Sequence, residues 1–210
     1  IVVLSKNTWN FFSGRKRDIF RNHKKVVYIP HPNMMYLWEN NDLSNNVDGR
    51  NNELSLLCFG PVLKYKGVDK LVRVMNSLNN YNIKCMVAGK CEKKYSEELM
   101  NLSTNNNTSF EFRFFEDSEL PLLFNSYDIC VFPLDLNSAL NSSSIMLSFS
   151  LGRTVIAPDI STLKDYPNEL YYAYSYKSED ESIENLRNCI IKVYEDKIKK
   201  NTILEEMGNK

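Results

Sequence analysis

The stretch Ile129–Asp159, ICVFPLDLNSALNSSSIMLSFSLGRTVIAPD, decides the fold that this sequence predicts. It opens with an unbroken apolar run, Ile129–Phe132, which is typical of a strand buried on both faces of a sheet. After a loop, Ser142–Ser144 begin a helix that ends at Gly152, and Thr154–Ala157 start a second buried strand. Strand, loop, helix and strand in this order form a βαβ unit, which favours a parallel sheet.

The start of that helix is a candidate site for an anion. Asn141 or Ser142 can cap the helix, because a short oxygen-bearing side chain accepts a hydrogen bond from an amide of the first turn. Open α/β sheets bind ligands at the carboxyl ends of their strands, where this helix begins. The free amides, the serine hydroxyls and the helix dipole could seat a phosphate there. The alternative is that the serines only cap and pack.

The chain from Leu54 onward repeats the alternation of strands and helices. The expected strands are Leu56–Phe59, Cys85–Ala88, Phe110–Phe114 and Leu170–Tyr174. The expected helices are Val68–Leu78, Tyr95–Ser103 and Ser182–Ile198. A further short helix is expected to be capped by Asp117 or Ser118 and to end at Asn125. The alternating Phe110–Phe114 run indicates a strand near the sheet edge. The whole pattern predicts an α/β fold with a doubly wound, Rossmann-like parallel sheet.

The composition excludes several classes of protein. Of the 210 residues, 43% are hydrophobic, and 26 basic residues balance 26 acidic ones, so no net charge recruits nucleic acid. We find neither an apolar run long enough to cross a bilayer nor a signal-peptide pattern. The five cysteines are odd in number and lack a metal-ligand spacing, so we expect buried thiols in a cytoplasmic protein.

Two further stretches are candidates for ligand contacts. The loop Gly60–Gly67, GPVLKYKG, lies between a strand and a helix, and its Lys64 and Lys66 could neutralise a diphosphate. It lacks the spacing of a P-loop or a dinucleotide fingerprint, and the alternative is a solvated loop. In Arg113–Glu119, RFFEDSE, an aromatic ring could lie against a base, although such rings are more often core. The sequence shows no nucleophile elbow.

In their order and spacing, four segments resemble the carboxyl-terminal domain of GT-B-fold glycosyltransferases, closest to retaining family four, which includes glycogen-synthase-like, capsule and lipopolysaccharide enzymes. These segments are LLCFGPVLKYKGVDKLVRVMNSL, KCMVAG, FRFFEDSELPLLFNSYDICVFPL and SSSIMLSFSLGRTVIAPD. The resemblance covers about residues 25–198. It implies that residues 1–52 are the end of an amino-terminal domain with the interdomain crossing and linker, 53–180 the nucleotide-sugar-binding domain, and 181–210 carboxyl-terminal helices. The missing amino-terminal domain would bind the acceptor.

The resemblance also implies roles for individual residues. Lys66, followed by Gly67, matches the family lysine that stabilises the leaving diphosphate, and Lys64 is the expected substitute for a family arginine that Pro61 replaces. The family's paired glutamates are absent. The implied donor diphosphate site consists of Gly60, Lys64, Lys66, Asn141, Ser142, Ser143 and Ser144, and the implied base site of Phe114, Phe115 and Glu119.

The implied function is transfer of a hexose, with retention, from a nucleotide sugar to a polysaccharide, lipopolysaccharide or other glycan or lipid-linked acceptor. The donor would be a UDP- or GDP-sugar, with no metal or other cofactor, and these 210 residues alone would be inactive. A degenerate scaffold module of a polysaccharide-assembly complex and a fragment of a GT-B-fold sugar-nucleotide epimerase are the alternatives. The basic clusters Arg15–Arg17 and Lys197–Lys200 could contact the inner face of a membrane, or could be solvated faces.

Overall fold

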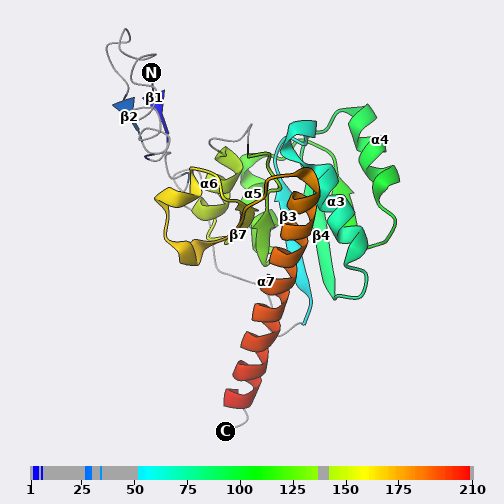
Figure 1. Cartoon of the computed structure of the whole chain (residues 1–210), viewed down its shortest axis with the longest axis vertical. Helices are drawn as coiled ribbons and strands as arrows, with labels where there is room; N and C mark the ends of the chain where they lie inside the picture. Colours follow the sequence, from blue (N-terminus) through cyan, green and yellow to red (C-terminus); the bar gives the residue numbers. More distant parts are fainter. Residues whose placement is uncertain are drawn as a thin grey trace.

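The computed structural model describes residues 2–4, 6, 27–29, 34, 52–136 and 142–208. Most of residues 1–52, expected to be the end of an amino-terminal domain with the crossing and linker, lie outside these residues, as do the basic cluster Arg15–Arg17 and the candidate ligand Asn141. Two short strands, β1 (Val2–Val3) and β2 (Val27–Tyr28), pair in parallel. Most of the other described elements build one sheet with helices on both faces (Figure 1).

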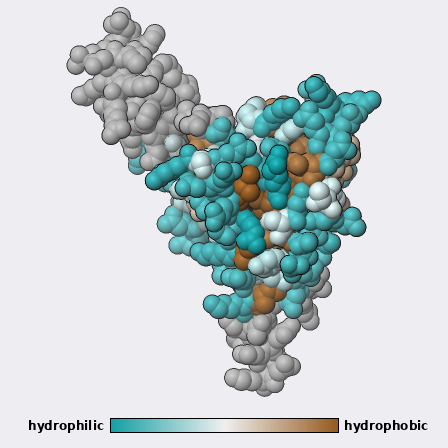
Figure 2. Space-filling model, turned by 45° about the vertical axis from the view of Figure 1, so that its right-hand side comes forward, coloured by the Kyte–Doolittle hydropathy of each residue, from teal (hydrophilic) through white to brown (hydrophobic). Residues whose placement is uncertain are grey.

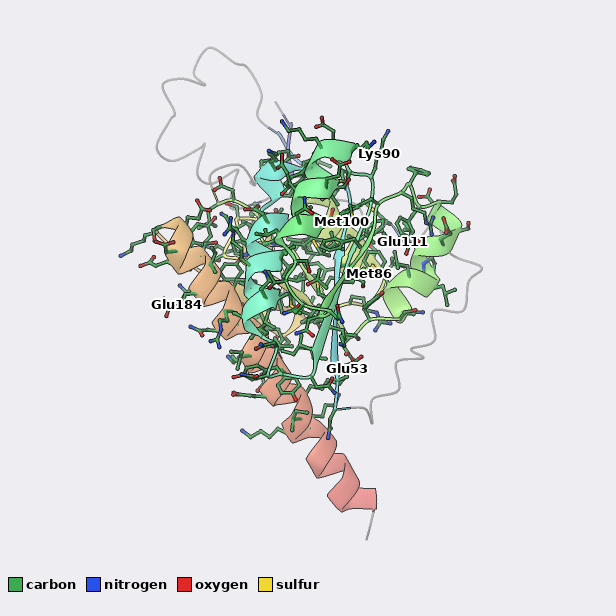
Figure 3. The ribbon with its side chains drawn as sticks, turned by 90° about the vertical axis from the view of Figure 1, so that its right-hand side faces the viewer. Glu53, Met86, Lys90, Met100, Glu111 and Glu184 are labelled. Atoms are coloured by element: carbon green, nitrogen blue, oxygen red, sulfur yellow. The ribbon has the colours of Figure 1, made fainter. Side chains whose placement is uncertain are left out.

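Six parallel strands form this sheet, in the spatial order β5, β4, β3, β6, β7 and β8. They are β3 (Leu54–Phe59), β4 (Ile83–Ala88), β5 (Thr108–Glu111), β6 (Ile129–Val131), β7 (Val155–Pro158) and β8 (Tyr171–Tyr174). The doubly wound α/β fold is therefore confirmed. The strand order reverses between β3 and β6, and at such a switch point a crevice opens at the carboxyl ends of the strands. In Figure 3 this end is the upper one, where Lys90 follows β4, and Glu53 precedes β3 at the lower end.

Helices cover both faces of the sheet and enclose two hydrophobic cores. The helices are α3 (Val68–Ser77), α4 (Lys93–Leu102), α5 (Leu120–Asn125), α6 (Ser143–Ser150) and α7 (Glu179–Gly208). Side chains of α3, α4 and α7 share one core, and those of α5 and α6 share the other. Strand β6 contributes Ile129 and Val131 to the first core and Cys130 to the second, so it is buried on both faces as its sequence predicts.

Several boundaries differ from the sequence predictions, and strands β3, β4 and β5 each begin two residues earlier than predicted. Strand β5 is an edge strand as expected, but it ends at Glu111, where its pairing with β4 stops, and not at Phe114. Neither Asp117 nor Ser118 caps the following helix: Glu116 and Glu119 form a capping box around a 3-10 turn, and α5 begins after it. The last helix is longer than the predicted Ser182–Ile198.

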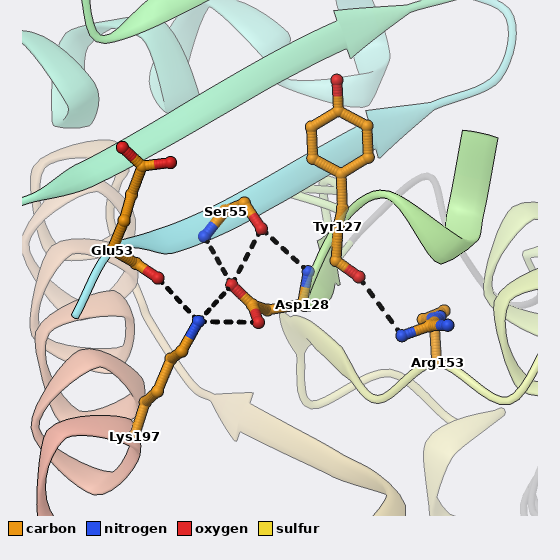
Figure 4. Close-up of polar contacts among 6 residues, drawn as sticks. All are labelled: Glu53, Ser55, Tyr127, Asp128, Arg153 and Lys197. Carbon is orange, nitrogen blue, oxygen red and sulfur yellow. Dashed lines mark hydrogen bonds and ion pairs between the residues drawn. The ribbon is translucent and has the colours of Figure 1, made fainter. Parts of the chain in front are cut away.

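The long helix α7 is fixed to the amino-terminal end of the sheet by a polar network (Figure 4). The Lys197 ammonium lies 2.8 Å from both carboxylate oxygens of Asp128, which precedes β6, and donates to the carbonyl of Glu53. The backbone N–H and the hydroxyl of Ser55 both donate to the same carboxylate at 2.8 Å. The Lys197 and Asp128 side chains are only 14% and 15% exposed, so water screens this ion pair little.

Several large hydrophobic side chains remain exposed, but they do not merge into one face. The most exposed are Leu122 and Phe114, at 76% and 67%. On the side shown in Figure 2, hydrophilic residues separate the hydrophobic areas. In the described part of the chain, no helix combines the length and the apolar character that a membrane span requires.

The network at Asp128 predicts the effect of removing its cation. We expect Lys197→Met to lower the free energy of unfolding by about 2 kcal/mol, because Asp128 would keep a shielded charge without its partner. Urea unfolding measures this change. Lys199→Met, on an exposed part of the same helix, is the control and should cost less than about 0.5 kcal/mol. Equal costs for the two variants would contradict the assignment of Lys197 as an anchor.

Candidate functional site

Two loops meet at the switch point of the sheet. The loop after β3 contains a 3-10 turn, Lys64–Lys66, and ends at Gly67, which begins α3 in the left-handed conformation with a φ of 68°. A Cβ atom at Gly67 would collide with the carbonyl oxygen of Pro133, in the loop after β6. The two backbones can therefore approach this closely only because residue 67 is glycine.

The contact between the loops encloses a small pocket. Its lining includes Gly60 and Lys66 from the first loop, Phe132 and Pro133 from the end of β6, and Ser144 from α6. The enclosed space is only about 10 Å³, which is close to the room that one water molecule needs. The pocket is therefore too small to enclose a group much larger than a water molecule.

Gly60 lies next to both polar groups of this pocket. The position that a Cβ atom would take at residue 60 is 2.7 Å from Ser144 Oγ and 3.6 Å from Lys66 Nζ. The ammonium and the hydroxyl thus face the same space above the glycine, and any larger residue at position 60 would fill it. The sequence predicted that the lysine loop and the serine-led helix lie together, and the structure brings Gly60, Lys66 and Ser144 together.

Lys66 is a partly buried cation without a carboxylate partner among the described residues. Burial lowers the pKa of its ammonium from the ordinary value of 10.5, because the charged form loses hydration. The Cys58 thiol, which also lines the pocket, does not neutralise it: burial raises the pKa of that thiol to about 12, so the thiol is uncharged at neutral pH. The positive charge of Lys66 is therefore available to a ligand.

The amino terminus of α6 adds a second positive element. Ser142 caps this helix, as one of the two sequence predictions stated, by accepting a hydrogen bond from the N–H of Ile145 at 3.4 Å. The amides of Ser143 and Ser144 belong to the first turn, which has no preceding helical carbonyls to bond. Together with the helix dipole they favour an anion at this end. Ser143 is exposed, and Ser144 is buried against the pocket.

Lys64 takes a different direction from Lys66. Its ammonium forms an ion pair with Glu98 of α4 at 2.9 Å and lies 5.5 Å from the centre of the Tyr95 ring. These three residues line a groove of about 340 Å³ beside α3 and α4, together with Asp69 and Arg73. The structure therefore does not bring Lys64 to the pocket at Gly60.

The three base-site candidates lie in different environments beyond β5. Phe115 is buried and packs edge-to-face on Phe59, with ring centres 5.6 Å apart. The guanidinium of Arg113 covers the Phe115 ring at 3.8 Å and bonds to Glu119 at 2.8 Å, which lowers the pKa of that carboxyl. Only Phe114 offers an exposed ring. The sequence analysis did not predict a role for Arg113, which bonds to both Glu111 and Glu119. The only sequence feature that could have indicated this ion-pair cluster is the presence of a glutamate on each side of the arginine.

The described residues of the pocket include no aspartate, glutamate or histidine. Its polar side chains are those of Lys66, Ser144 and the neutral Cys58. The described part of the chain contains no group of three His, Cys, Asp or Glu side chains that could hold a metal ion. What this arrangement can supply is positive potential for an anion.

Known structures share the fold of this chain at low sequence identity. A sucrose-phosphate synthase from Thermosynechococcus elongatus matches 94% of this chain with a TM-score of 0.70 and 16% identity. The catalytic domain of starch synthase IV from Arabidopsis thaliana, bound to ADP and acarbose, matches 93% with a TM-score of 0.66 and 9% identity. Alr3699/HepE from Anabaena, in complex with UDP-glucose, matches 90% with a TM-score of 0.61 and 16% identity.

The chain spans about half the length of these structures, which it covers to 49%, 48% and 53%. No curated protein sequence matches the chain. The sequence profile described as "Glycosyl transferases group 1" matches residues 41–210. Because that match takes in most of the sequence, the resemblance is confirmed, and this chain belongs to the group 1 glycosyltransferase family.

Proposed function

We propose that this chain is the donor-binding half of a glycosyltransferase, which holds a nucleoside-diphosphate sugar by its diphosphate between Lys66 and the first turn of α6. The observation that carries this proposal is that Lys66 Nζ and Ser144 Oγ both lie within 3.6 Å of one point, the position that a Cβ atom would take at Gly60. A partly buried ammonium that has no carboxylate partner among the described residues, close to the amino end of a helix, is an environment that an anion stabilises.

The same groups would assist the chemical step. In sugar transfer, the bond between the anomeric carbon and the β-phosphate oxygen breaks, and the anomeric carbon forms a bond to an acceptor hydroxyl, which loses its proton. Negative charge accumulates on the departing diphosphate, and Lys66 with the amides of Ser143 and Ser144 would stabilise it. Each such preorganised donor lowers the activation free energy by about 3 kcal/mol.

The partners of the proposed reaction are a UDP- or GDP-hexose donor and a polysaccharide, lipopolysaccharide or other glycan acceptor, with retention at the anomeric carbon. Alr3699/HepE has been solved with UDP-glucose, and WaaG, which takes part in lipopolysaccharide biosynthesis, has the same fold with a TM-score of 0.61 and 16% identity. An amino-terminal half would bind the acceptor. We propose that the 210 residues bind the donor weakly and transfer nothing alone.

Two lysines of one turn provide a matched test of the diphosphate site. We expect Lys66→Ala to weaken binding of UDP or GDP about tenfold or more, because a charged hydrogen bond to phosphate is lost. Lys64→Ala removes the same charge two residues away, where Glu98 already pairs with it, and should change affinity less than about threefold. Titration calorimetry gives both values. Equal affinities of the wild type and Lys66→Ala for UDP and GDP would contradict the proposal.

The lowered pKa of Lys66 predicts a pH dependence of binding. As pH rises through that pKa, below the ordinary lysine value of 10.5, the ammonium loses its proton and affinity for UDP should fall. A bound diphosphate favours the charged lysine, so binding there should take up protons. The diphosphate itself is fully ionised well above pH about 6 and adds no change. Calorimetry in two buffers of different ionisation enthalpy measures the uptake, and Lys66→Ala should abolish it.

The exposed ring of Phe114 is the proposed contact for the base. We expect Phe114→Ala to weaken binding of UDP about fivefold and to leave binding of inorganic pyrophosphate unchanged, because only UDP carries a ring to pack on it. Leu122→Ala, which removes another exposed apolar side chain, is the control. If Phe114→Ala weakens binding of both UDP and pyrophosphate, the base contact is contradicted, and the substitution instead disturbs the loop after β5.

A further inference from the structure

One hydroxyl from the end of the sheet holds the loop that follows β6. Tyr176 lies between β8 and α7, and its hydroxyl accepts a hydrogen bond from the N–H of Leu136 at 2.8 Å. The same hydroxyl donates to the carbonyl of Leu134 at 3.3 Å. It thus bridges a donor and an acceptor two residues apart in a loop that is about 40 positions away in sequence. Because Leu134 also lines the pocket at Gly60, this hydroxyl fixes one wall of the site.

Helix α7 in turn fixes the segment that carries Tyr176. The side-chain amide of Asn185 donates to the carbonyl of Ser175 at 2.8 Å, and the carboxylate of Glu181 accepts from the N–H of Lys177 at 2.6 Å. The residues on both sides of Tyr176 are therefore bonded to the first turns of α7. The Tyr176 ring also stacks on the buried Tyr174, with ring centres 6.2 Å apart. These contacts with α7 and Tyr174 fix the position from which the Tyr176 hydroxyl reaches the loop after β6.

The ring of Tyr176 also touches the other half of the site. Lys70 Nζ lies 5.6 Å from the centre of this ring, within the range of a cation–π contact. Lys70 belongs to the first turn of α3, and its N–H donates to the carbonyl of Gly67 at 3.0 Å. A single side chain therefore contacts both the loop after β6, through its hydroxyl, and the first turn of α3, through its ring.

We propose that Tyr176 is a positioning residue for the donor site: its hydroxyl holds the Leu134–Leu136 segment, and Leu134 forms one wall of the pocket that Lys66 and Ser144 also line. The inference rests on the proposed function, because positioning matters only if the donor site takes an anion. Tyr176 lines neither the small pocket nor the groove beside α4, so it acts through the loop and not by touching the ligand.

The test is Tyr176→Phe, which removes the hydroxyl and keeps the ring on Lys70 and Tyr174. We expect the amide of Leu136 to exchange its hydrogen faster, and affinity for UDP to fall about threefold to tenfold, the range that one lost hydrogen bond corresponds to. Tyr172→Phe is the control: it removes a hydroxyl of β8 that donates to Asp196 on α7, away from the loop. It should change neither the exchange of Leu136 nor the affinity.

A double-mutant cycle separates positioning from a general loss of stability. Ser144 and the Leu134 wall that Tyr176 holds border the same pocket, so in the background of Ser144→Ala, which removes one of its polar groups, Tyr176→Phe should have a smaller effect on affinity than in the wild type. Wild-type binding of UDP with an unchanged affinity in Tyr176→Phe would overturn the inference and leave the proposed function standing. Full additivity of the two substitutions would also overturn it. No UDP binding by the wild type would overturn both.

Discussion

The reversal of strand order between β3 and β6 is the constraint on which the rest of the structure depends. The two strands are neighbours, with Leu56 opposite Ile129, but the helices that follow them pack on opposite faces of the sheet. The two connections must therefore diverge, and the space between them is the crevice in which this fold binds its ligands. Glycine at position 67 lets one connection reach the backbone of the other, so the opening narrows to a small pocket.

The electrostatics of that pocket oppose the stability of the free domain. A partly buried ammonium loses hydration, and without a carboxylate nearby nothing within the described fold offsets this loss at Lys66. The penalty is present while the lysine is charged and is relieved as pH rises through its lowered pKa. Strained electrostatics of this kind are typical of functional sites, because the ligand supplies the missing charge. The paired, anchored Lys197 shows the opposite arrangement at the other end of the sheet.

The sequence predicted the architecture well because its signals were local. The apolar run at Ile129 and the cap at Ser142 each depend on a few adjacent residues, and both are where the pattern indicated. Lys64 and Lys66 could not be told apart in this way. They stand in a 3-10 turn of three residues, in which side chains two positions apart point about 120° away from each other, so only one reaches the pocket. The two hydrogen bonds of Tyr176 join segments about 40 residues apart, and no pattern in the sequence marks them.

The network around Asp128 lies at the amino-terminal end of the sheet, opposite the loops that build the pocket. The anchor of α7 and the proposed ligand site therefore lie at opposite ends of the same strands. A scaffold divided in this way tolerates the exchange of its recognition loops, since a new loop leaves the anchoring end intact. Related chains could thus diversify in the sugars they handle while retaining one framework, and a designer could graft loops onto this domain with the same freedom.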